Sequence, residues 1–368
     1  LGVGMEYSVM QQYWIWLSSV DGIGAKRFYR LLSQYGDARG VWDNIGDGDM
    51  TFLGPKTLKT LRAARTEGYF FRLFAEMERT GMRAVTRISA GYPQALNEIH
   101  DPPPTLYVRG EAPLDAERMF AIVGSRRATR DGKRAAREFA AALARENVCV
   151  VSGLARGVDT CAHEGALEGG GTTIAVLGSG ADVIYPPENE DLVSRILASG
   201  GAVISELAPG TRPAPGNFPA RNRIISGLCR GVLLVEGSQT SGAMITAGLA
   251  IEQGRDVFAV PGSIYAPLSA APNRLIFDGA NPALSAWDIL EHYRWGVRPA
   301  RSAAKGREIE LDEDERSLYD ALCEQELSFD ELSALSKFPA SKLNSLLTSL
   351  ELRGIIVKAP GGIYRAYQ

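Results

Sequence analysis

The chain has 368 residues, of which 45% are hydrophobic and 23% are charged, and its net charge is −3 at pH 7. This length exceeds what one ordinary hydrophobic core needs, so it predicts two or three domains, and the composition is that of a folded, soluble protein. The small net charge excludes a polycation that binds nucleic acid over its whole surface, so any such contact requires a local basic patch.

The cysteines are scattered along the chain without a CxxC pair: Cys149, Cys161, Cys229 and Cys323. Their spacing argues against a zinc site or a disulfide framework and favours a reducing compartment. The opening segment LGVGMEYSVMQQYWIWLSS has no basic n-region, and its apolar run is too short to span a bilayer. We therefore expect a cytoplasmic protein with no membrane attachment, no metal and no cofactor.

Residues 5–110 are predicted to form a helical domain of the SAM-like or helix-hairpin-helix type. The segment VDGIGAKRFYRLLSQYG places a tight turn before an amphipathic helix, and FLGPKTLKTLRAA repeats this arrangement after Gly54 and Pro55. Such hairpins can bind a DNA backbone through the amides of the glycine turn, whereas in a simple bundle the glycines only flank the helices. The degenerate repeat favours the simple bundle.

The pattern changes over residues 111–296, where short apolar runs alternate with helical segments. The predicted strands are MFAIV, VCVVSGL, TTIAVLG, AVISEL, GVLLVE and DVFAVPG. Continuously apolar strands are typical of a sheet that is buried on both faces, and the alternation predicts an α/β fold with a Rossmann-like, doubly wound parallel sheet. Ligands of such sheets bind beyond the carboxyl ends of the strands, where this chain repeatedly has glycine or serine. We predict one long site lined by backbone.

A linker is predicted over residues 297–313, and residues 314–368 show three helical segments and a hairpin around Gly361 and Gly362, which is the order of a winged helix. The candidate recognition helix, PASKLNSLLTSLELRG, has few long polar groups: Lys342, Asn344, Glu351 and Arg353. An acidic run from Glu308 to Glu315 precedes it. Because a helix that reads the major groove needs side chains that reach base edges, this composition favours an accessory or protein-contacting module.

The segment FAIVGSRRATRDGKRAAREFA predicts a strand, a glycine turn and a helix start. Amides of the turn around Gly124 and Ser125, together with the helix N-terminus, form an anion site to which Arg126 adds a forked cation. The GxGxxG and P-loop signatures are absent. Further basic residues either extend this positive charge or form a solvated helix face: Arg127, Arg130, Lys133, Arg134 and Arg137.

Four acidic or histidine side chains are candidates for other chemistry. Asp159 and His163 have the i, i+4 spacing of a metal site, but two ligands without a third favour a capping aspartate and a packed histidine. No GxSxG nucleophile elbow occurs. Glu206 and Glu236, at strand ends, either act as acid and base or, as we prefer, accept hydrogen bonds from the glycine loops.

The segment NFPARNRIISGL places an aromatic ring and two arginines at the start of an apolar helix. Cations near a helix N-terminus favour phosphates, and Phe218, between polar residues and Pro219, suits a stacking platform. Stacking of a base on such a ring contributes roughly 1–3 kcal/mol for any base. In the alternative interpretation, Arg221 and Arg223 form structural pairs with Glu206 or Glu236.

Several segments, in this order, resemble the DNA-processing protein A family (DprA, also called Smf): IVGSR, VVSGLARGVDTCAH, GGGTTIAVLGSGADVIYPPEN, ISELAPG, FPARNRIISGL, VEGSQTSGAMITA and GRDVFAVPG. The resemblance implies a non-enzymatic protein that binds single-stranded DNA and helps load a RecA-type recombinase onto it in natural transformation. It also implies a homodimer through the α/β domain. The candidate DNA-binding residues are Gly124, Ser125, Arg126, Gly153, Phe218, Arg221, Asn222 and Arg223.

The chain departs from the family pattern in SAAPNRLIFDGA, where Ala271 replaces a glycine and Pro272 follows, which predicts a different closure of that loop. Apolar residues expected at a dimer face, in part, are Met244, Ile245, Leu249, Ile251, Leu275 and Ile276. Two competing hypotheses remain. One is a nucleotide phosphoribohydrolase of the lonely-guy type, whose PGGxGTxxE signature has only VPGSIYAP as its nearest equivalent. The other is a nucleotide-sensing module, because a backbone-lined groove can hold a mononucleotide.

Overall fold

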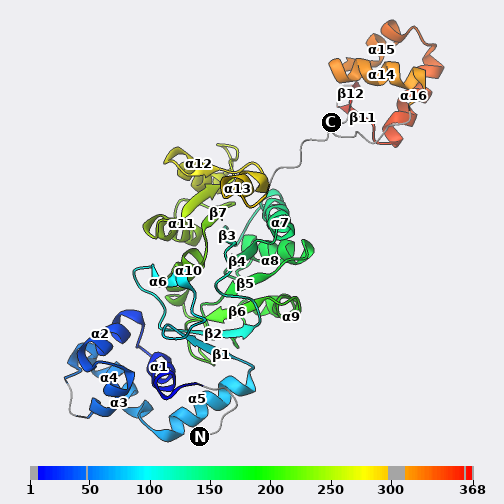
Figure 1. The fold of residues 1–368 in the computed structure, drawn as a ribbon. Coiled ribbons are helices and arrows are strands. Elements are labelled where there is room, and N and C mark those ends of the chain that lie inside the picture. Colours follow the sequence, from blue (N-terminus) through cyan, green and yellow to red (C-terminus); the bar gives the residue numbers. More distant parts are fainter. Residues whose placement is uncertain (1–6, 47–48, 297–310, 360–361, 367–368) are drawn as a thin grey trace. The chain divides into compact units, whose positions relative to one another are not determined.

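The computed structural model describes residues 7–46, 49–296, 311–359 and 362–366, in two compact units, Leu1–Val297 and Arg298–Gln368 (Figure 1). The predicted linker falls mostly in residues 297–310, outside the described residues. In the described ranges, no helix has the length and apolar character that a membrane crossing requires.

Unit 1 begins with a group of short helices: α1 (Val9–Ser19), α2 (Ala25–Tyr35), α3 (Ala38–Asn44), the 3₁₀ helix η1 (Thr51–Leu53), α4 (Gly54–Ala64) and α5 (Glu67–Arg79). Trp16, Phe28 and Leu31 are fully buried among them. The glycine turn before α2 contacts the second repeat, because Gly22, with a φ of +86°, packs against Thr57 of α4. The two predicted hairpins therefore share one core.

The rest of unit 1 is built on a nine-stranded sheet, as counted over the described residues. Its strands are β1 (Arg83–Thr86), β2 (Thr105–Gly110), β3 (Met119–Val123), β4 (Cys149–Ser152), β5 (Thr173–Val176), β6 (Ala202–Ser205), β7 (Gly231–Leu234), β8 (Asp256–Ala259) and β9 (Asn281–Pro282). Their order across the sheet is β1-β2-β6-β5-β4-β3-β7-β8-β9, and β3 to β9 are parallel. The predicted doubly wound α/β sheet is confirmed, with each predicted strand present as one of β3 to β8.

Residues 83–110 differ from the prediction of a helical region that extends to residue 110. β1 and β2 belong to the sheet, because β2 pairs antiparallel with β6, with Tyr107 opposite Ser205, and β1 pairs antiparallel with β2. Leu106, Tyr107 and Val108 are all fully buried, so they form a continuous apolar run like those of the other inner strands. The length of that run is the signal that separates it from the helices before it.

Helices cover both faces of the sheet (Figure 1). One face carries α6 (Gln94–Asn97), α10 (Asn217–Leu228), α11 (Gly242–Glu252) and α12 (Ala270–Phe277), the last preceded by η3 (Pro267–Ser269). The other carries α7 (Arg130–Arg145), α8 (Val158–Glu168), α9 (Glu190–Ala198), which follows η2 (Pro187–Asn189), and α13 (Ala286–His292). α7 illustrates why these helices form, because Thr129 accepts a hydrogen bond from the Gly132 amide as its N-cap and an alanine-rich face packs on the sheet.

Unit 2 is a small three-helix domain with a three-stranded sheet in its described part. It consists of α14 (Glu313–Glu324), β10 (Leu327–Ser328), α15 (Phe329–Ser336), α16 (Ala340–Leu352), β11 (Ile356–Ala359) and β12 (Ile363–Ala366). The capping boxes of Asp312 and Ser328 begin α14 and α15. The antiparallel pairing of β11 with β12 after α16 confirms the predicted winged helix.

Candidate nucleic-acid interface

The candidate site lies at the carboxyl ends of the parallel strands, beside the point where the winding of the sheet reverses. The chain leaves β3 through α7 toward β4 on one side, and leaves β7 through α11 toward β8 on the other. α7 and α11 cover opposite faces, and doubly wound sheets bind ligands at such a point, although here the loops beyond β3 and β7 are joined by the hydrogen bond from the Ser125 amide to the Glu236 carbonyl oxygen.

Phe218, in the first turn of α10, is the centre of an aromatic and cationic cluster at this edge. The guanidinium carbon of Arg126 lies 5.4 Å from the centroid of the Phe218 ring, and the Tyr185 ring centroid lies 5.6 Å away at an interplanar angle of 43°. Gly178, just after β5, packs against the same ring so closely that a β-carbon there would lie 2.9 Å from Cδ1 of Phe218. Residues of two loops, those after β3 and after β5, therefore hold one half-exposed ring in place.

The turn that carries Arg126 is fixed by the strand-end residue Glu236. Its carbonyl oxygen accepts from the amide of Ser125 at 2.7 Å, and its carboxylate accepts from the amide and hydroxyl of Thr129 at 2.8 and 2.5 Å. The amide of Arg127 donates to the Ser125 hydroxyl. The prediction that these amides bind an anion therefore needs correction. Several amides of the turn already donate within the protein, and the Glu236 carboxylate already lies at the α7 N-terminus.

Arg221 lies beneath this surface and is only 5% exposed. Its Nη1 donates to the carbonyl oxygens of Gly153, at 2.9 Å, and Val176, and its Nε donates to the side chain of Asn222 at 3.2 Å. The prediction that Arg221 contacts phosphate does not fit this position. Burial lowers its pKa to about 10, while the nearby Asp159 carboxylate opposes that shift.

Position 153 requires glycine because two buried side chains, those of Arg221 and Asp159, lie close to its α-carbon. A β-carbon at this position would lie 2.7 Å from Nη2 of Arg221 and 2.8 Å from Oδ2 of Asp159. The same Asp159 oxygen accepts from the amides of Gly153 and Ala155 at 3.2 and 3.4 Å. Burial raises the pKa of Asp159 to about 6, although Arg221 and these amides favour its ionised form. Gly153, Arg221 and Asp159 thus form a structural layer under the candidate surface.

Arg223 is tied to Glu206, as in the alternative interpretation of the sequence. Its Nη1 and Nη2 donate to the two carboxylate oxygens at 2.8 and 2.6 Å, and its Nε donates to the carbonyl oxygen of Asp101 at 2.9 Å. The two side chains are 14% and 16% exposed. Asn222 is also buried and donates to the carbonyl oxygen of Gly242. Of the three predicted arginines, only Arg126 is exposed.

The candidate metal ligands Asp159 and His163 are both buried in the protein interior. His163 is fully buried, its Nδ1 lies 2.7 Å from the hydroxyl of Thr173, and burial lowers its pKa to about 3. Asp159 binds loop amides rather than His163, as the capping interpretation expected. Among the described residues, no three or more His, Cys, Asp or Glu side chains gather as a metal site would require.

Tyr185 is the site residue that sequence reasoning missed. It is 38% exposed, and it follows the apolar Ile184 in a loop after β5, two residues from the start of η2. A large aromatic residue next to prolines, in a segment without helical or strand periodicity, is the signal that was available. The same signal identified Phe218.

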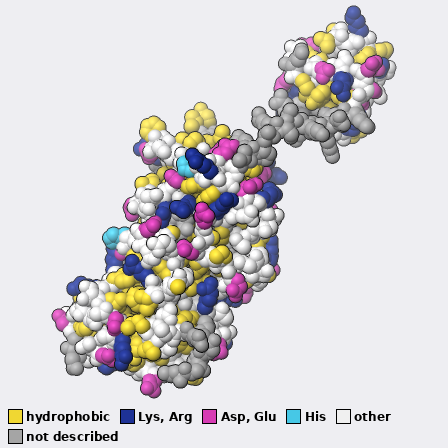
Figure 2. All heavy atoms as spheres, in the orientation of Figure 1, with side chains coloured by type: hydrophobic (Ala, Val, Ile, Leu, Met, Phe, Trp, Pro, Cys, Tyr) yellow, Lys and Arg dark blue, Asp and Glu magenta, His cyan; other side chains and the backbone are white. Residues whose placement is uncertain are grey.

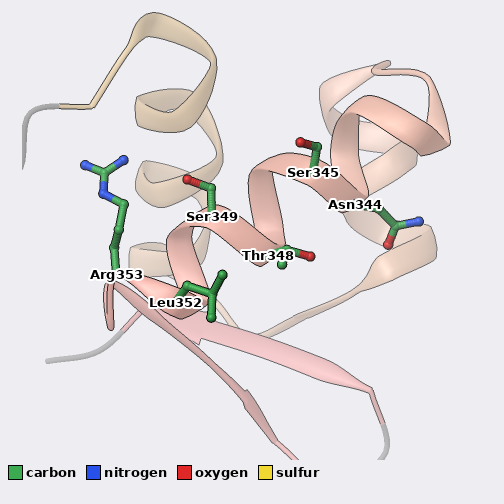
Figure 3. A pocket seen from close by; sticks show the side chains of 6 residues that line it. All are labelled: Asn344, Ser345, Thr348, Ser349, Leu352 and Arg353. Carbon is green, nitrogen blue, oxygen red and sulfur yellow. The ribbon is translucent and has the colours of Figure 1, made fainter.

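Unit 2 presents a different surface, a hollow along α16 (Figure 3). It is lined by Asn344, Ser345, Thr348, Ser349, Leu352 and Arg353. Arg353 donates to both carboxylate oxygens of Glu315 at 2.8 and 2.9 Å, and Lys342 forms an ion pair with Asp314 at 2.5 Å. Both basic side chains of this helix face are therefore neutralised by α14, which supports the prediction that unit 2 does not read base edges.

Comparison with known proteins relates the chain to several bacterial proteins. A family model described as DNA recombination-mediator protein A matches residues 83–294, and one described as the DprA winged helix domain matches residues 302–362. Protein Smf of Synechocystis sp. is 32% identical over 394 residues, which cover 96% of this chain and 98% of that protein. Protein Smf of Escherichia coli is 37% identical over 78% of this chain and 79% of that protein.

Two solved structures share the fold. The crystal structure of DNA processing protein A from Streptococcus pneumoniae has a TM-score of 0.64 and 34% identity, over 78% of this chain and 98% of that one. The protein from Helicobacter pylori, whose structure concerns its single-stranded DNA binding mode, has a TM-score of 0.53 and 30% identity, over 58% of this chain and 97% of that one. The two family models together cover the central sheet and the winged helix, and the first matches more than half of the chain. This chain belongs to the DNA recombination-mediator protein A family.

Proposed function

We propose that this protein binds single-stranded DNA, catalyses no reaction on it, and delivers the strand to a RecA-type recombinase during natural transformation. The cluster of Phe218, Arg126 and Tyr185 at the sheet edge carries the proposal. An aromatic ring stacks with any base and a guanidinium binds phosphate through two hydrogen bonds, so the cluster suits a strand of any sequence. The Helicobacter pylori relative, described by its single-stranded DNA binding, and the family's description as a recombination mediator support it.

The contacts of the acidic residues argue against an enzyme acting on nucleotides. Glu206 binds Arg223 through both oxygens, and the Glu236 carboxylate holds the start of α7. Neither carboxylate is free to transfer a proton to a substrate. The carboxylate at the α7 N-terminus also occupies the position where a mononucleotide phosphate binds in nucleotide-binding sheets, so the nucleotide-sensing hypothesis is disfavoured too.

Self-association through the α11 and α12 side of unit 1 belongs to the same proposal. Ile245 and Ile251 of α11 are 45% and 60% exposed, and Phe277 at the end of α12 is 80% exposed. Figure 2 shows hydrophobic side chains projecting where α12 lies. Leu275, by contrast, is buried and belongs to the core. We expect a homodimer in the cytoplasm, and light scattering should show that Phe277→Lys produces monomers, whereas a monomeric wild-type protein at tens of micromolar would contradict the dimer.

The test of the function is a titration of labelled oligonucleotide, single-stranded against duplex, over a salt series. Wild-type protein should prefer the single strand, and Phe218→Leu should weaken binding by roughly 5- to 150-fold, which corresponds to about 1–3 kcal/mol of lost stacking. Phe71→Leu is the matched control, because Phe71 is 65% exposed on α5 and does not belong to the cluster of Phe218, Arg126 and Tyr185.

Two results would contradict the proposal: Phe218→Leu binding as tightly as Phe71→Leu, or duplex binding as tightly as single strand. Incubation with nucleoside monophosphates should release free base only at the background rate. Base release that disappears on Glu206→Gln or Glu236→Gln would instead establish the enzyme.

A further inference from the structure

The basic residues that follow Arg126 divide into two groups by their ion pairs. Nε of Arg134 lies 3.1 Å from Oε1 of Glu138, and Arg137 pairs with Glu164 and, at 3.2 Å, with Glu168. The second group consists of Arg127, Arg130 and Lys133, which are exposed and, across the described ranges, form no ion pair. These three residues form the α7 track.

The α7 track begins next to the candidate site and continues away from it. Arg127 follows Arg126 directly, and Arg130 and Lys133 follow at intervals of three residues. Arg130 and Lys133 lie in α7, where a separation of three residues keeps side chains on one side and about 4.5 Å apart along the axis, and Arg127 lies in the turn that precedes the helix. The track therefore extends the positive charge of Arg126 along the exposed side of the first turn of α7.

The location of this charge is unfavourable for the helix alone. The N-terminus of a helix carries the positive end of its macrodipole, so acidic residues stabilise the first turn and basic residues destabilise it. Here Asp131 is the one acidic residue of the first turn, against Arg130, Lys133 and the preceding Arg127. The Glu236 carboxylate at the same helix start offsets part of the dipole, so the unpaired cations are the main source of a positive field in a chain whose overall charge is −3. An anionic ligand is what that field favours.

We propose that a single strand held at Phe218 and Arg126 runs on over the beginning of α7 and places successive phosphates on the α7 track. This inference rests on the proposed single-strand binding. Residues 127–134, RATRDGKR, contain no aromatic side chain, so the track binds backbone and not bases. It should therefore contribute affinity that depends on salt and on the length of the strand but not on its sequence.

The experiment compares Arg130→Gln/Lys133→Gln with Arg134→Gln/Arg145→Gln, which removes the same charge from the same helix. Arg134 is ion-paired and Arg145 lies in the last turn, so neither belongs to the track. Binding of the full-length protein is measured with single strands of about 4 and about 16 nucleotides, within the range of lengths that single-strand sites occupy. A duplex of the longer length is the third probe.

For the long single strand, the track variant should lose about 1.4 from the slope of log K against log salt, at 0.7 for each lost phosphate contact. That change corresponds to roughly 25-fold weaker binding at 0.1 M salt. The short strand should bind both variants like wild type. Melting temperatures should be unchanged or slightly raised in the track variant, since it removes cations from a helix N-terminus.

Three outcomes would overturn the inference: equal long-strand slopes in the two variants, an equal loss for the short strand, or a loss for the duplex as large as for the single strand. The last would mean that the residues supply only a general positive field. If wild type binds neither strand, the proposed function fails, and with it this inference. If wild type binds both and only the slope prediction fails, the function stands without the track.

Discussion

The pair formed by Arg223 and Glu206 provides a direct test of whether buried arginines at this site bind DNA or support the fold. Arg223→Met keeps the apolar stem but removes the two bonds to Glu206 and the one to the Asp101 carbonyl. Breaking a buried ion pair from one side typically costs 3–5 kcal/mol, because the remaining charge stays buried without a partner. Since both side chains retain about 15% exposure, we expect the lower end, about 3 kcal/mol.

Tryptophan fluorescence is the appropriate assay, because all five tryptophans lie in unit 1: Trp14, Trp16, Trp42, Trp287 and Trp295. A loss of about 3 kcal/mol should lower the melting temperature of this unit by roughly 5–10 °C. Arg223→Met combined with Glu206→Gln should cost less than the sum of the two single changes, with a coupling of about 1–3 kcal/mol.

Affinity for a single strand, measured well below the melting temperature, separates the two roles. Arg223→Met should bind nearly as tightly as wild type, because the guanidinium is already committed to Glu206. A variant with unchanged melting temperature and greatly weakened binding would refute this reasoning and return Arg223 to the DNA interface.

Three further predictions concern Tyr185, His163 and unit 2. Tyr185→Leu should weaken single-strand binding by roughly 1 kcal/mol while leaving stability unchanged, and unchanged affinity would remove this ring from the site. From pH 7 to pH 5, protonation of His163 in the unfolded chain should lower the free energy of unfolding by about 2 kcal/mol, while protonation of Asp159 in the folded chain should raise it by about 1 kcal/mol. His163→Gln removes the first effect, so its free energy of unfolding should rise on acidification; a decline parallel to that of wild type would contradict this. Removal of residues 298–368 should leave most of the single-strand affinity, and its loss would place the principal site in unit 2.

The sheet could be predicted because its signal is local. Each inner strand is a short, continuously apolar run, and runs such as MFAIV and GVLLVE are buried throughout in β3 and β7. β1, at the edge of the sheet, and β2, between β1 and β6, were missed because they are short and follow a run of helices, and because β2 pairs antiparallel with β6, which is distant in sequence. Such pairing depends on long-range contacts, which no window of the sequence contains.

The site was predicted less completely because charge does not reveal burial. The segment FPARNR places Phe218 at the surface and Arg221 in the interior, although both lie within the first turns of one helix. Only the partners decide this difference: Arg221 meets the carbonyl oxygens of Gly153 and Val176, and Arg223 meets Glu206. These partners lie at the ends of three strands, β4, β5 and β6, and their positions depend on the order of the strands.

The glycines at the strand ends explain how this buried layer supports the surface above it. They were predicted to expose backbone to a ligand, but the structure fills the space beside each with a side chain of the protein itself. Gly153 accommodates Arg221 and Gly178 accommodates the ring of Phe218, and Gly132, in the first turn of α7, likewise accommodates the Glu236 carboxylate. A β-carbon at any of them would displace a group that fixes the turn of Arg126 or the stacking ring. Because both are held in this way before DNA arrives, less conformational entropy is lost on binding than with mobile side chains, so the glycines act on affinity through preorganisation and not through contact.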